Sequence, residues 1–309
     1  MINIALYGLG KIAFDQHIPT INSSKDFKLI AAISKTESIS GISVFSSISK
    51  LYDSNIKVDA ISLCVPPSTR FKIALEAISR GYNLFLEKPP CKSLEECKIL
   101  IDLAGSKGIT IFAGWHSKYA LMISRAKDWI NSYGYDHFEI NWKENVNKWH
   151  PNQNWITRKN GFGVFDSGIN ALSILYELTS DDFFAEKIEF YRPRNWESPI
   201  AASFNLGKRN KLCGSVNFDF RACEKESWEI KFTSGKNELF LSNGGQCMQI
   251  DKTHIELKDK KNSEYEDMYL HFRDAILQKQ INFDTRPLNL VEKLFEKASW
   301  YEVEEFVSI

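Results

Sequence analysis

The sequence carries no surplus of charge of either sign, because 39 lysines and arginines stand against 39 aspartates and glutamates in 309 residues. Proteins that bind nucleic acids or anionic membrane surfaces usually carry a basic surplus that meets the phosphates. We therefore expect neither a nucleic acid nor a membrane surface to be a main partner of this chain.

Long apolar runs are also missing, since none approaches the roughly 18–20 residues needed to cross a bilayer. The stretch Met1–Tyr7 has no basic region, and its apolar part is too short for a signal peptide. The six cysteines form no C-x-x-C pair and are typical of reduced thiols. We expect a cytoplasmic protein, and 43% apolar residues are enough for a folded core in one large or two smaller domains.

The first part of the chain alternates short apolar strands with helices. Apolar residues at 71, 74, 75 and 78 have helical spacing, and Gly81 follows where that helix should end. The predicted strands are 2–7, 28–33, 60–65, 84–86 and 109–113, and the predicted helices run to residue 22 and over 69–80 and 93–106. This alternation predicts a parallel sheet built from βαβ units.

The second part of the chain is richer in consecutive strands. Strands are predicted at 138–143 and repeatedly between 188 and 257, with helices at 166–178, 264–279 and 288–306. Strands without intervening helices indicate an open mixed or antiparallel sheet. We therefore predict an α/β protein with a parallel-sheet domain over 1–117 and an α+β domain over 118–309, whose final helices can pack back on the first domain. Four aromatic residues in this region could form a homodimer face of the sheet or pack on helices within the subunit: Phe218, Phe220, Trp228 and Phe232.

A glycine-rich loop directly follows the first predicted strand. Residues 8–13 read Gly-Leu-Gly-Lys-Ile-Ala, which fits G-x-G-x-x-A before a helix. In such a loop Gly8 permits a tight turn, and Gly10 lets backbone N–H groups approach a pyrophosphate. The βαβ context therefore predicts a dinucleotide site that includes Gly8, Gly10, Lys11 and Ile12.

The end of the second strand bears on which dinucleotide is bound. An acidic residue usually holds the ribose 2′-hydroxyl of NAD at this place. The sequence has Ser34, Lys35 and Thr36 instead, and a lysine suits a 2′-phosphate. Because Glu37 is close by, we expect NADP as cofactor with NAD as an accepted alternative.

Two later strand ends also carry candidate cofactor residues. Pro66 ends the strand at 60–65, and Glu87-Lys88-Pro89-Pro90 ends the strand at 84–86. The carboxyl ends of parallel strands are where such sheets bind ligands. An ammonium group such as Lys88 can there hydrogen-bond a hydroxyl and adjust its acidity.

The E-K-P sequence after a G-x-G-x-x-A domain resembles the Gfo/Idh/MocA oxidoreductase family. The resemblance extends over the whole chain. Within the family, the sequence is similar to the branch that oxidises L-arabinose- or D-galactose-type sugars at C1. Its more specific segments are 115–117, 142–144, 149–151, 153–156 and 163–172. The resemblance implies a Rossmann domain followed by an open-faced mixed sheet, NAD(P)-dependent oxidation of the anomeric carbon, and an aldonolactone product.

Asp166 and Asn170 are the candidate proton-handling pair, because their i, i+4 spacing places them on one face at the start of a helix. Many members of the family have a histidine in the place of Asn170, and an amide cannot exchange a proton near neutral pH. We expect Asp166 to take the proton, assisted by Lys88, and Asn170 to hold the sugar. The neighbouring Gly161, Gly163 and Gly168 indicate close approach of a ligand.

Aromatic and polar residues are expected to line the pocket of a small neutral sugar, since such pockets combine apolar walls with a few aimed polar groups. The candidates are His116, Glu144, Trp149, His150 and Trp155, together with Asn170. No helical HxxxH or HExxH spacing supports a metal, so none is expected. Two alternatives stay open: a dinucleotide- or sugar-binding regulator without catalysis, and an oxidoreductase of the same family acting on a cyclitol or keto-sugar.

Overall fold

The computed structural model describes residues 1–151, 153–159, 161–222, 224–257 and 262–307. The chain forms two compact units. The first unit comprises Met1–His116 with Asn262–Thr285, and the second comprises Ser117–Lys261 with Arg286–Ile309.

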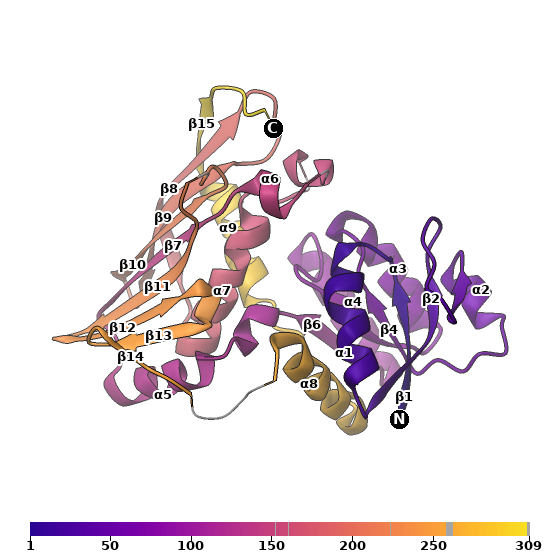
Figure 1. Ribbon diagram of the computed structural model, residues 1–309. Helices are drawn as coiled ribbons and strands as arrows, with labels where there is room; N and C mark the ends of the chain where they lie inside the picture. The colour runs from indigo at the N-terminus through magenta and orange to yellow at the C-terminus, as the bar shows by residue number, and fades with distance from the viewer. Residues whose placement is uncertain (152, 160, 223, 258–261, 308–309) are drawn as a thin grey trace. The chain divides into compact units, whose positions relative to one another are not determined.

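The first unit is built on a six-stranded parallel sheet (Figure 1). In sheet order its strands are β3 (Ser43–Phe45), β2 (Phe27–Ile33), β1 (Ile2–Tyr7), β4 (Ala60–Leu63), β5 (Asn83–Glu87) and β6 (Ile111–Gly114). The strand order reverses between β1 and β4, and such a switch point is where open parallel sheets bind ligands at their carboxyl ends. The predicted parallel sheet of βαβ units is confirmed.

Helices cover this sheet and complete its core. They are the π-helical turn η1 (Ala13–His17), α1 (Ile18–Ser23), α2 (Ile48–Tyr52), α3 (Pro67–Ser79), α4 (Leu94–Lys107) and, from the later segment, α8 (Glu264–Gln278). The rings of Phe85 and Tyr269 stack at 5.3 Å, and those of Phe112 and Phe272 lie 5.7 Å apart. The aromatic face of α8 therefore belongs to the core beneath β5 and β6.

The second unit contains a nine-stranded mixed sheet. In sheet order its strands are β14 (Thr253–His254), β13 (Cys247–Ile250), β12 (Asn237–Ser242), β11 (Ser227–Ser234), β7 (His137–Lys143), β10 (Lys211–Asp219), β9 (Ala201–Lys208), β8 (Phe184–Pro193) and β15 (Ser299–Val303). The pairs β7–β10 and β8–β15 are parallel, and the other neighbours are antiparallel. The predicted open mixed sheet is confirmed.

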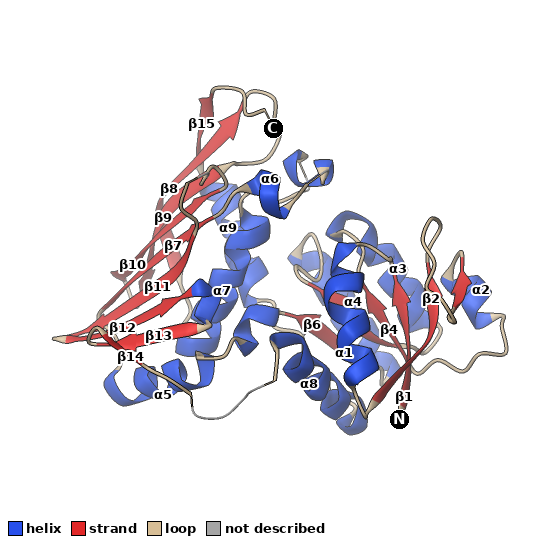
Figure 2. Ribbon diagram, in the orientation of Figure 1, coloured by secondary structure: helices blue, strands red, loops and turns tan. Residues whose placement is uncertain are grey.

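The helices of the second unit lie on one face of this sheet (Figure 2). They are α5 (Ile123–Tyr133), α7 (Phe165–Thr179) and α9 (Arg286–Lys297), accompanied by the short turns η2 (His116–Tyr119), α6 (Val146–Trp149), η3 (Asn154–Thr157) and η4 (Asn243–Gly245). Within the described ranges no helix covers the opposite face. That face carries the polar residues that alternate with buried ones along β7, for example Glu139 and Asn141.

The aromatic side chains of Phe218 on β10, Phe232 on β11 and Phe220, directly after β10, pack within the second unit. Phe218, Phe220 and Phe232 are almost completely buried, and the rings of Phe165 on α7 and Phe218 meet edge to face at 5.5 Å. Of the two predicted alternatives for these residues, packing within the subunit is the one observed. Trp228 is partly exposed and meets the ring of Trp149 at 5.4 Å.

The predicted helix over 288–306 is wrong beyond residue 297. The helix α9 ends at Lys297, and Ser299–Val303 forms the edge strand β15 instead. Trp300 and Tyr301 pair with Phe190 and Tyr191 of β8. Bulky aromatic residues fit a pleated edge better than another helical turn, and the free edge of β8 supplies their hydrogen-bonding partner.

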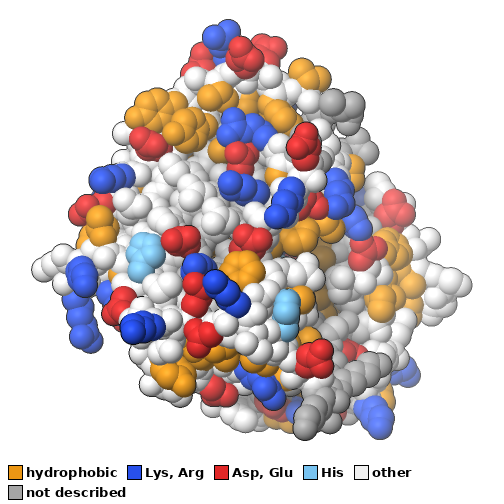
Figure 3. Space-filling model, turned by 60° about the vertical axis from the view of Figure 1, so that its left-hand side comes forward, with side chains coloured by type: hydrophobic (Ala, Val, Ile, Leu, Met, Phe, Trp, Pro, Cys, Tyr) orange, Lys and Arg blue, Asp and Glu red, His pale blue; other side chains and the backbone are white. Residues whose placement is uncertain are grey.

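Acidic and basic side chains are interspersed over the face of the molecule shown in Figure 3, in keeping with the zero net charge. Among the described residues, no helix combines the length and the apolar character that crossing a membrane requires.

Candidate active site

The glycine-rich loop begins where β1 ends, at the switch point of the first sheet. Gly8 has a φ of +89°, which favours glycine, and its N–H donates to the carbonyl of Ile33 at 2.9 Å. A Cβ at this position would lie 2.7 Å from Cγ1 of Val65. A Cβ at Gly10 would instead meet no atom within 4 Å. The loop is therefore tight at Gly8 and open at Gly10, as a close approach of a pyrophosphate requires.

A cavity of about 370 Å³ lies between this loop and the end of β2. It is lined by predicted residues, namely Gly8, Gly10, Ser34, Lys35 and Thr36, and by Tyr7, Leu9, Ile33, Glu37, Ser46 and Val65. These residues fit a dinucleotide, because the cavity joins the phosphate loop to the polar tip of β2. Ser46 escaped the sequence analysis because it follows the very short strand β3.

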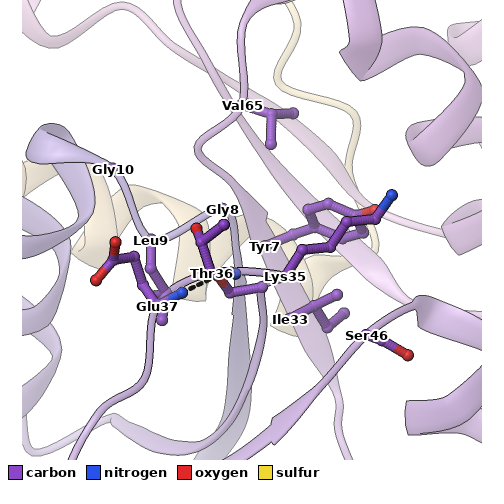
Figure 4. Close-up of a pocket in the computed structure, with 11 residues that line it drawn as sticks. Tyr7, Gly8, Leu9, Gly10, Ile33, Lys35, Thr36, Glu37, Ser46 and Val65 are labelled. Carbon is purple, nitrogen blue, oxygen red and sulfur yellow. Dashed lines mark hydrogen bonds between the residues drawn. The ribbon is translucent and has the colours of Figure 1, made fainter.

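Lys35 and Glu37 extend to opposite sides of the β2 tip. In Figure 4 the ammonium of Lys35 lies on the side of Tyr7, whereas the carboxylate of Glu37 lies on the side of Leu9 and Gly10. The backbone N–H groups of Thr36 and Glu37 both donate to the hydroxyl of Ser34, at 3.3 and 3.0 Å. This local turn fixes the directions of the two charged side chains.

Five predicted cofactor residues are not among the described residues that line this cavity, namely Lys11, Ile12, Pro66, Glu87 and Lys88. Lys11 and Ile12 start the helical segment after the loop, and Lys11 pairs with Asp15. Pro66 stands directly before α3.

The loop that carries Lys88 is held by a buried arginine. The Arg70 guanidinium, on α3, donates to the carbonyls of Glu87 and Pro89, which flank Lys88, and to the carbonyl of Val65 at 3.1 Å. Charged donors to otherwise unpaired backbone carbonyls rigidify a loop. Lys88 itself is partly exposed and starts from a fixed backbone.

Glu87 is the centre of a closed polar cluster, here called the Glu87 cluster: His17, Glu87, Tyr265 and Tyr269. Nε2 of His17 lies 2.9 Å from Oε1 of Glu87, and the Tyr265 hydroxyl donates to the same oxygen at 2.8 Å. Nδ1 of His17 lies 2.7 Å from the Tyr269 hydroxyl. Of these four residues only Glu87 is predicted from the sequence, because no local pattern connects the π-helical turn at His17 with α8.

The Glu87 cluster contains a buried ion pair. Burial would raise the pKa of Glu87, but the hydrogen bond and charge of His17 lower it to about 2. Burial would lower the pKa of His17, yet Cys64, Tyr269 and Glu87 together raise that pKa well above its ordinary value. Each of the two groups therefore favours the charged form of the other, as in an ion pair.

His116 also belongs to the first unit. Its Nδ1 lies 2.6 Å from Oε2 of Glu264, and its ring stacks on that of Tyr265 at 6.0 Å. The structure thus places this predicted sugar residue beside the start of α8.

A second polar cluster, here called the His150 cluster, lies in the second unit: Glu144, His150 and Asp166. Nε2 of His150 lies 3.1 Å from Oε1 of Glu144, and its Nδ1 lies 3.9 Å from Oδ2 of Asp166. Both carboxylates are buried, while 14% of the His150 side chain is exposed. The structure therefore brings together three of the predicted site residues, which come from three different segments.

Asn170 lies one helical turn from Asp166 on α7. Within the part of the chain that the structure describes, its Oδ1 is buried and has no hydrogen-bond partner. A buried acceptor of this kind is ordinarily satisfied by a protein group, a water molecule or a ligand. Asn170 therefore fits the predicted role of holding a hydroxyl group.

Tryptophans lie around the His150 cluster. The indole N–H of Trp228 donates to Oε2 of Glu144 at 3.1 Å, and that of Trp149 donates to Glu226. Trp149 is 40% exposed, and Trp155 on η3 is partly exposed. The rings of Trp228 and Trp149 therefore offer flat apolar surface beside Glu144. Trp228 was predicted only as part of the sheet.

The glycines near Asp166 serve packing of the chain against itself, which corrects their predicted ligand contact. A Cβ at Gly161 would lie 2.0 Å from the carbonyl oxygen of Trp155, and one at Gly163 would lie 2.2 Å from that of Pro199. A Cβ at Gly168 would lie 2.4 Å from the Phe218 ring. These contacts let α7 and its preceding loop approach the sheet closely.

Among the described residues, no group of three or more histidine, cysteine, aspartate or glutamate side chains is arranged to hold a metal ion.

Comparisons with known proteins agree with this architecture. Residues 2–115 match the family model described as the oxidoreductase family with an NAD-binding Rossmann fold, GFO_IDH_MocA. The chain is 36% identical to galactose 1-dehydrogenase of Pseudomonas fluorescens over 307 residues, covering 99% of this chain and 98% of the relative.

Solved structures show the same similarity. A D-galactose 1-dehydrogenase from Rhizobium etli superimposes with a TM-score of 0.94 at 36% identity, covering 99% of this chain and 98% of that one. A 3-ketoreductase from Actinomadura kijaniata, solved with NADP and TDP-benzene, has a TM-score of 0.84 at 13% identity over 98% and 99% of the two chains, which shows a shared fold. The chain therefore belongs to the Gfo/Idh/MocA family and is an oxidoreductase with a nicotinamide-dinucleotide-binding Rossmann domain.

Proposed function

We propose that the chain is an NAD(P)-dependent aldose 1-dehydrogenase, which oxidises the anomeric carbon of a galactose- or arabinose-type pyranose to the aldonolactone. The observation that carries this proposal is the 36% identity to galactose 1-dehydrogenase over nearly the whole chain. The carboxylates, amide and tryptophans of the second unit add the polar and apolar groups that a neutral sugar needs.

The first unit is proposed to bind the dinucleotide and the second to bind the sugar. The cavity beside Gly8 and Gly10 supports the first role, and the His150 cluster supports the second. Within the dinucleotide site, Lys35 favours NADP, while Glu37 suits the ribose hydroxyls of NAD. We therefore propose NADP as the preferred cofactor and NAD as a second one.

The bound nicotinamide supplies the hydride acceptor, and the protein's residues handle the proton and the orientation. Asp166 is proposed to take the proton of the anomeric hydroxyl as C1 becomes a carbonyl carbon. Lys88 is proposed to hydrogen-bond the C1 oxygen, and its clamped backbone limits its positions. Holding the reactants in one geometry supplies a large part of such a rate.

Asn170 and the neighbouring side chains are proposed to hold the sugar ring. The unpaired Oδ1 of Asn170 can accept a sugar hydroxyl. Trp149 and Trp155 can pack against its C–H groups, with His116, Glu144 and His150 as further hydroxyl partners.

Reduction of NADP or NAD in the presence of a sugar panel tests the proposal. The panel contains arabinose, galactose, fucose, xylose and glucose, and it is extended to inositols. We expect turnover with galactose or arabinose and trapping of the product by hydroxylamine, as a lactone requires. Dinucleotide binding without turnover would favour a regulator, and turnover confined to inositols would favour a cyclitol dehydrogenase.

We further propose a cytoplasmic location and a homodimer formed through the helix-free face of the nine-stranded sheet. The polar residues on that face would make such an interface hydrogen-bonded rather than mainly apolar. Sedimentation of the wild type and of an Asn141→Arg variant distinguishes this dimer from a monomer.

A further inference from the structure

His150 lies between two buried carboxylates that belong to different segments of the second unit. Its Nε2 faces Oε1 of Glu144 at 3.1 Å, and its Nδ1 faces Oε1 of Gln153 at 3.4 Å and Oδ2 of Asp166 at 3.9 Å. One imidazole can thus exchange protons or form hydrogen bonds with both carboxylates, one through each ring nitrogen. The longer distance is suited to tightening when a ligand enters, since catalytic hydrogen bonds are often long in ligand-free proteins.

The partners of His150 are themselves held in place. The second oxygen of Glu144 accepts the indole N–H of Trp228 at 3.1 Å. The backbone N–H of His150 donates to the carbonyl of Val146 at 2.8 Å, and its ring packs against Phe220 with centroids 5.6 Å apart. The imidazole is therefore positioned by backbone, ring and carboxylate contacts together.

The contact with Glu144 selects the useful tautomer of His150. A carboxylate accepts a hydrogen bond, so Glu144 favours the tautomer with the proton on Nε2. This tautomer leaves a lone pair on Nδ1, the nitrogen that lies between the side-chain amide of Gln153 and the carboxylate of Asp166. A carboxylate that orients an imidazole in this way is a recurring arrangement in proton transfer.

We propose that His150 is the proton relay of the second unit, which removes from Asp166 the proton taken from the sugar; this inference rests on the proposed function. In each turnover the anomeric O–H bond breaks and its proton binds Asp166, while the C1 hydride reduces the nicotinamide. The proton then moves from Asp166 to Nδ1 of His150. The resulting imidazolium is held by Glu144 and passes one proton to water through its exposed edge.

A proton relay is required because Asn170 cannot remove the proton from Asp166. Its amide is well placed to hold a hydroxyl group but does not exchange protons near neutral pH. Asp166 is buried, so a proton left on it needs a route outward. His150 supplies that route from the segment after α6.

A His150→Gln variant tests the relay, because glutamine can still hydrogen-bond Glu144 but does not carry a proton. We expect kcat to fall about 100-fold with the KM for sugar changed by less than about threefold. A His150→Ala variant should regain about tenfold in rate with added imidazole. The matched control is His137→Gln, since His137 is an exposed histidine of the same unit.

The outcomes separate the relay from the proposed function. A raised KM with unchanged kcat in His150→Gln would overturn the relay and leave His150 as a sugar-binding group, while the wild-type turnover would still support the dehydrogenase. A wild type that is silent with every sugar would overturn both. Circular dichroism and the melting temperature identify a folding defect, in which case imidazole rescue of His150→Ala decides the matter.

Discussion

The Glu87 cluster and the His150 cluster both bury carboxylates beside a histidine, but they differ in their surroundings. In the Glu87 cluster the hydrogen-bond distances between the four side chains lie between 2.7 and 2.9 Å. Beside the His150 cluster, Oδ1 of Asn170 is buried and has no hydrogen-bond partner among the described residues. A closed network supports architecture, whereas a buried acceptor without a partner leaves hydrogen-bonding capacity for a ligand.

The largest expected effect is a loss of turnover in variants of the proposed catalytic residues Asp166 and Lys88. Asp166→Asn should lower kcat about 10³-fold, because the amide cannot take the proton, with little change in melting temperature. Lys88→Ala should also lower turnover, by about 100-fold. Sugar-dependent dinucleotide reduction measures both, and Asp128→Asn, an exposed aspartate on α5, is the control. Near-normal turnover in both variants would contradict the assigned roles.

The next largest effect is a loss of stability in a variant of the Glu87 cluster. Glu87→Gln should reduce the free energy of unfolding by about 3–5 kcal/mol, because it leaves the buried His17 without its counter-charge. Chemical denaturation measures this loss. Glu76→Gln is the matched control, since Glu76 forms a partly exposed ion pair with Arg80 and its loss should cost less than about 1 kcal/mol. Equal losses in the two variants would show that the buried pair contributes no more to the free energy of unfolding than the Glu76–Arg80 pair.

A smaller effect is expected from pH, which changes the stability that the Glu87 cluster contributes. The pKa of Glu87 is lowered from 4.5 to about 2, so its contribution is present above pH 4.5 and is lost as the pH falls toward 2. The pKa of His17 is raised above 6.5, so its contribution is complete below that pH and is lost as the pH rises through the raised value. Denaturation at several pH values should therefore show the Glu87→Gln deficit largest between pH 4.5 and 6.5. A deficit independent of pH would argue against an ion pair.

The smallest expected effect concerns cofactor choice. Lys35→Ala should raise the KM for NADP about tenfold and leave that for NAD nearly unchanged, because only NADP carries the 2′-phosphate. Glu37→Ala should act in the opposite direction, by weakening NAD relative to NADP. Steady-state kinetics with both dinucleotides measures the two ratios. If Lys35→Ala affected both cofactors equally, the lysine would not read the 2′-phosphate.

Features that depend on short stretches of sequence could be predicted. The phosphate loop follows from the glycine needed at Gly8, and the predicted parallel sheet follows from regular alternation of strands and helices. Candidate residues of the His150 cluster were found because they lie within 23 positions of one another and carry unusual side chains. Their mutual distances could not be predicted, because they depend on how the segment after α6 packs on α7.

Features that depend on distant segments could not be predicted. Tyr269 and His17 are separated by 252 positions, and no local pattern connects them. Residues 299–303 form a strand because they pair with the free edge of β8. No property of these residues alone identifies that partner. Tertiary partners decided both cases.

The contribution of α8 to the first unit has a consequence for folding during synthesis. The sheet of that unit is complete once Gly114 has left the ribosome, but Tyr265 and Tyr269 follow some 150 residues later. Until then Glu87 and His17 lack two of their partners, and Phe85 and Phe112 lack their aromatic cover. The part of the protein that is made first is thus finished only after most of the second unit has been synthesised, and its nascent form exposes apolar surface that chaperones recognise.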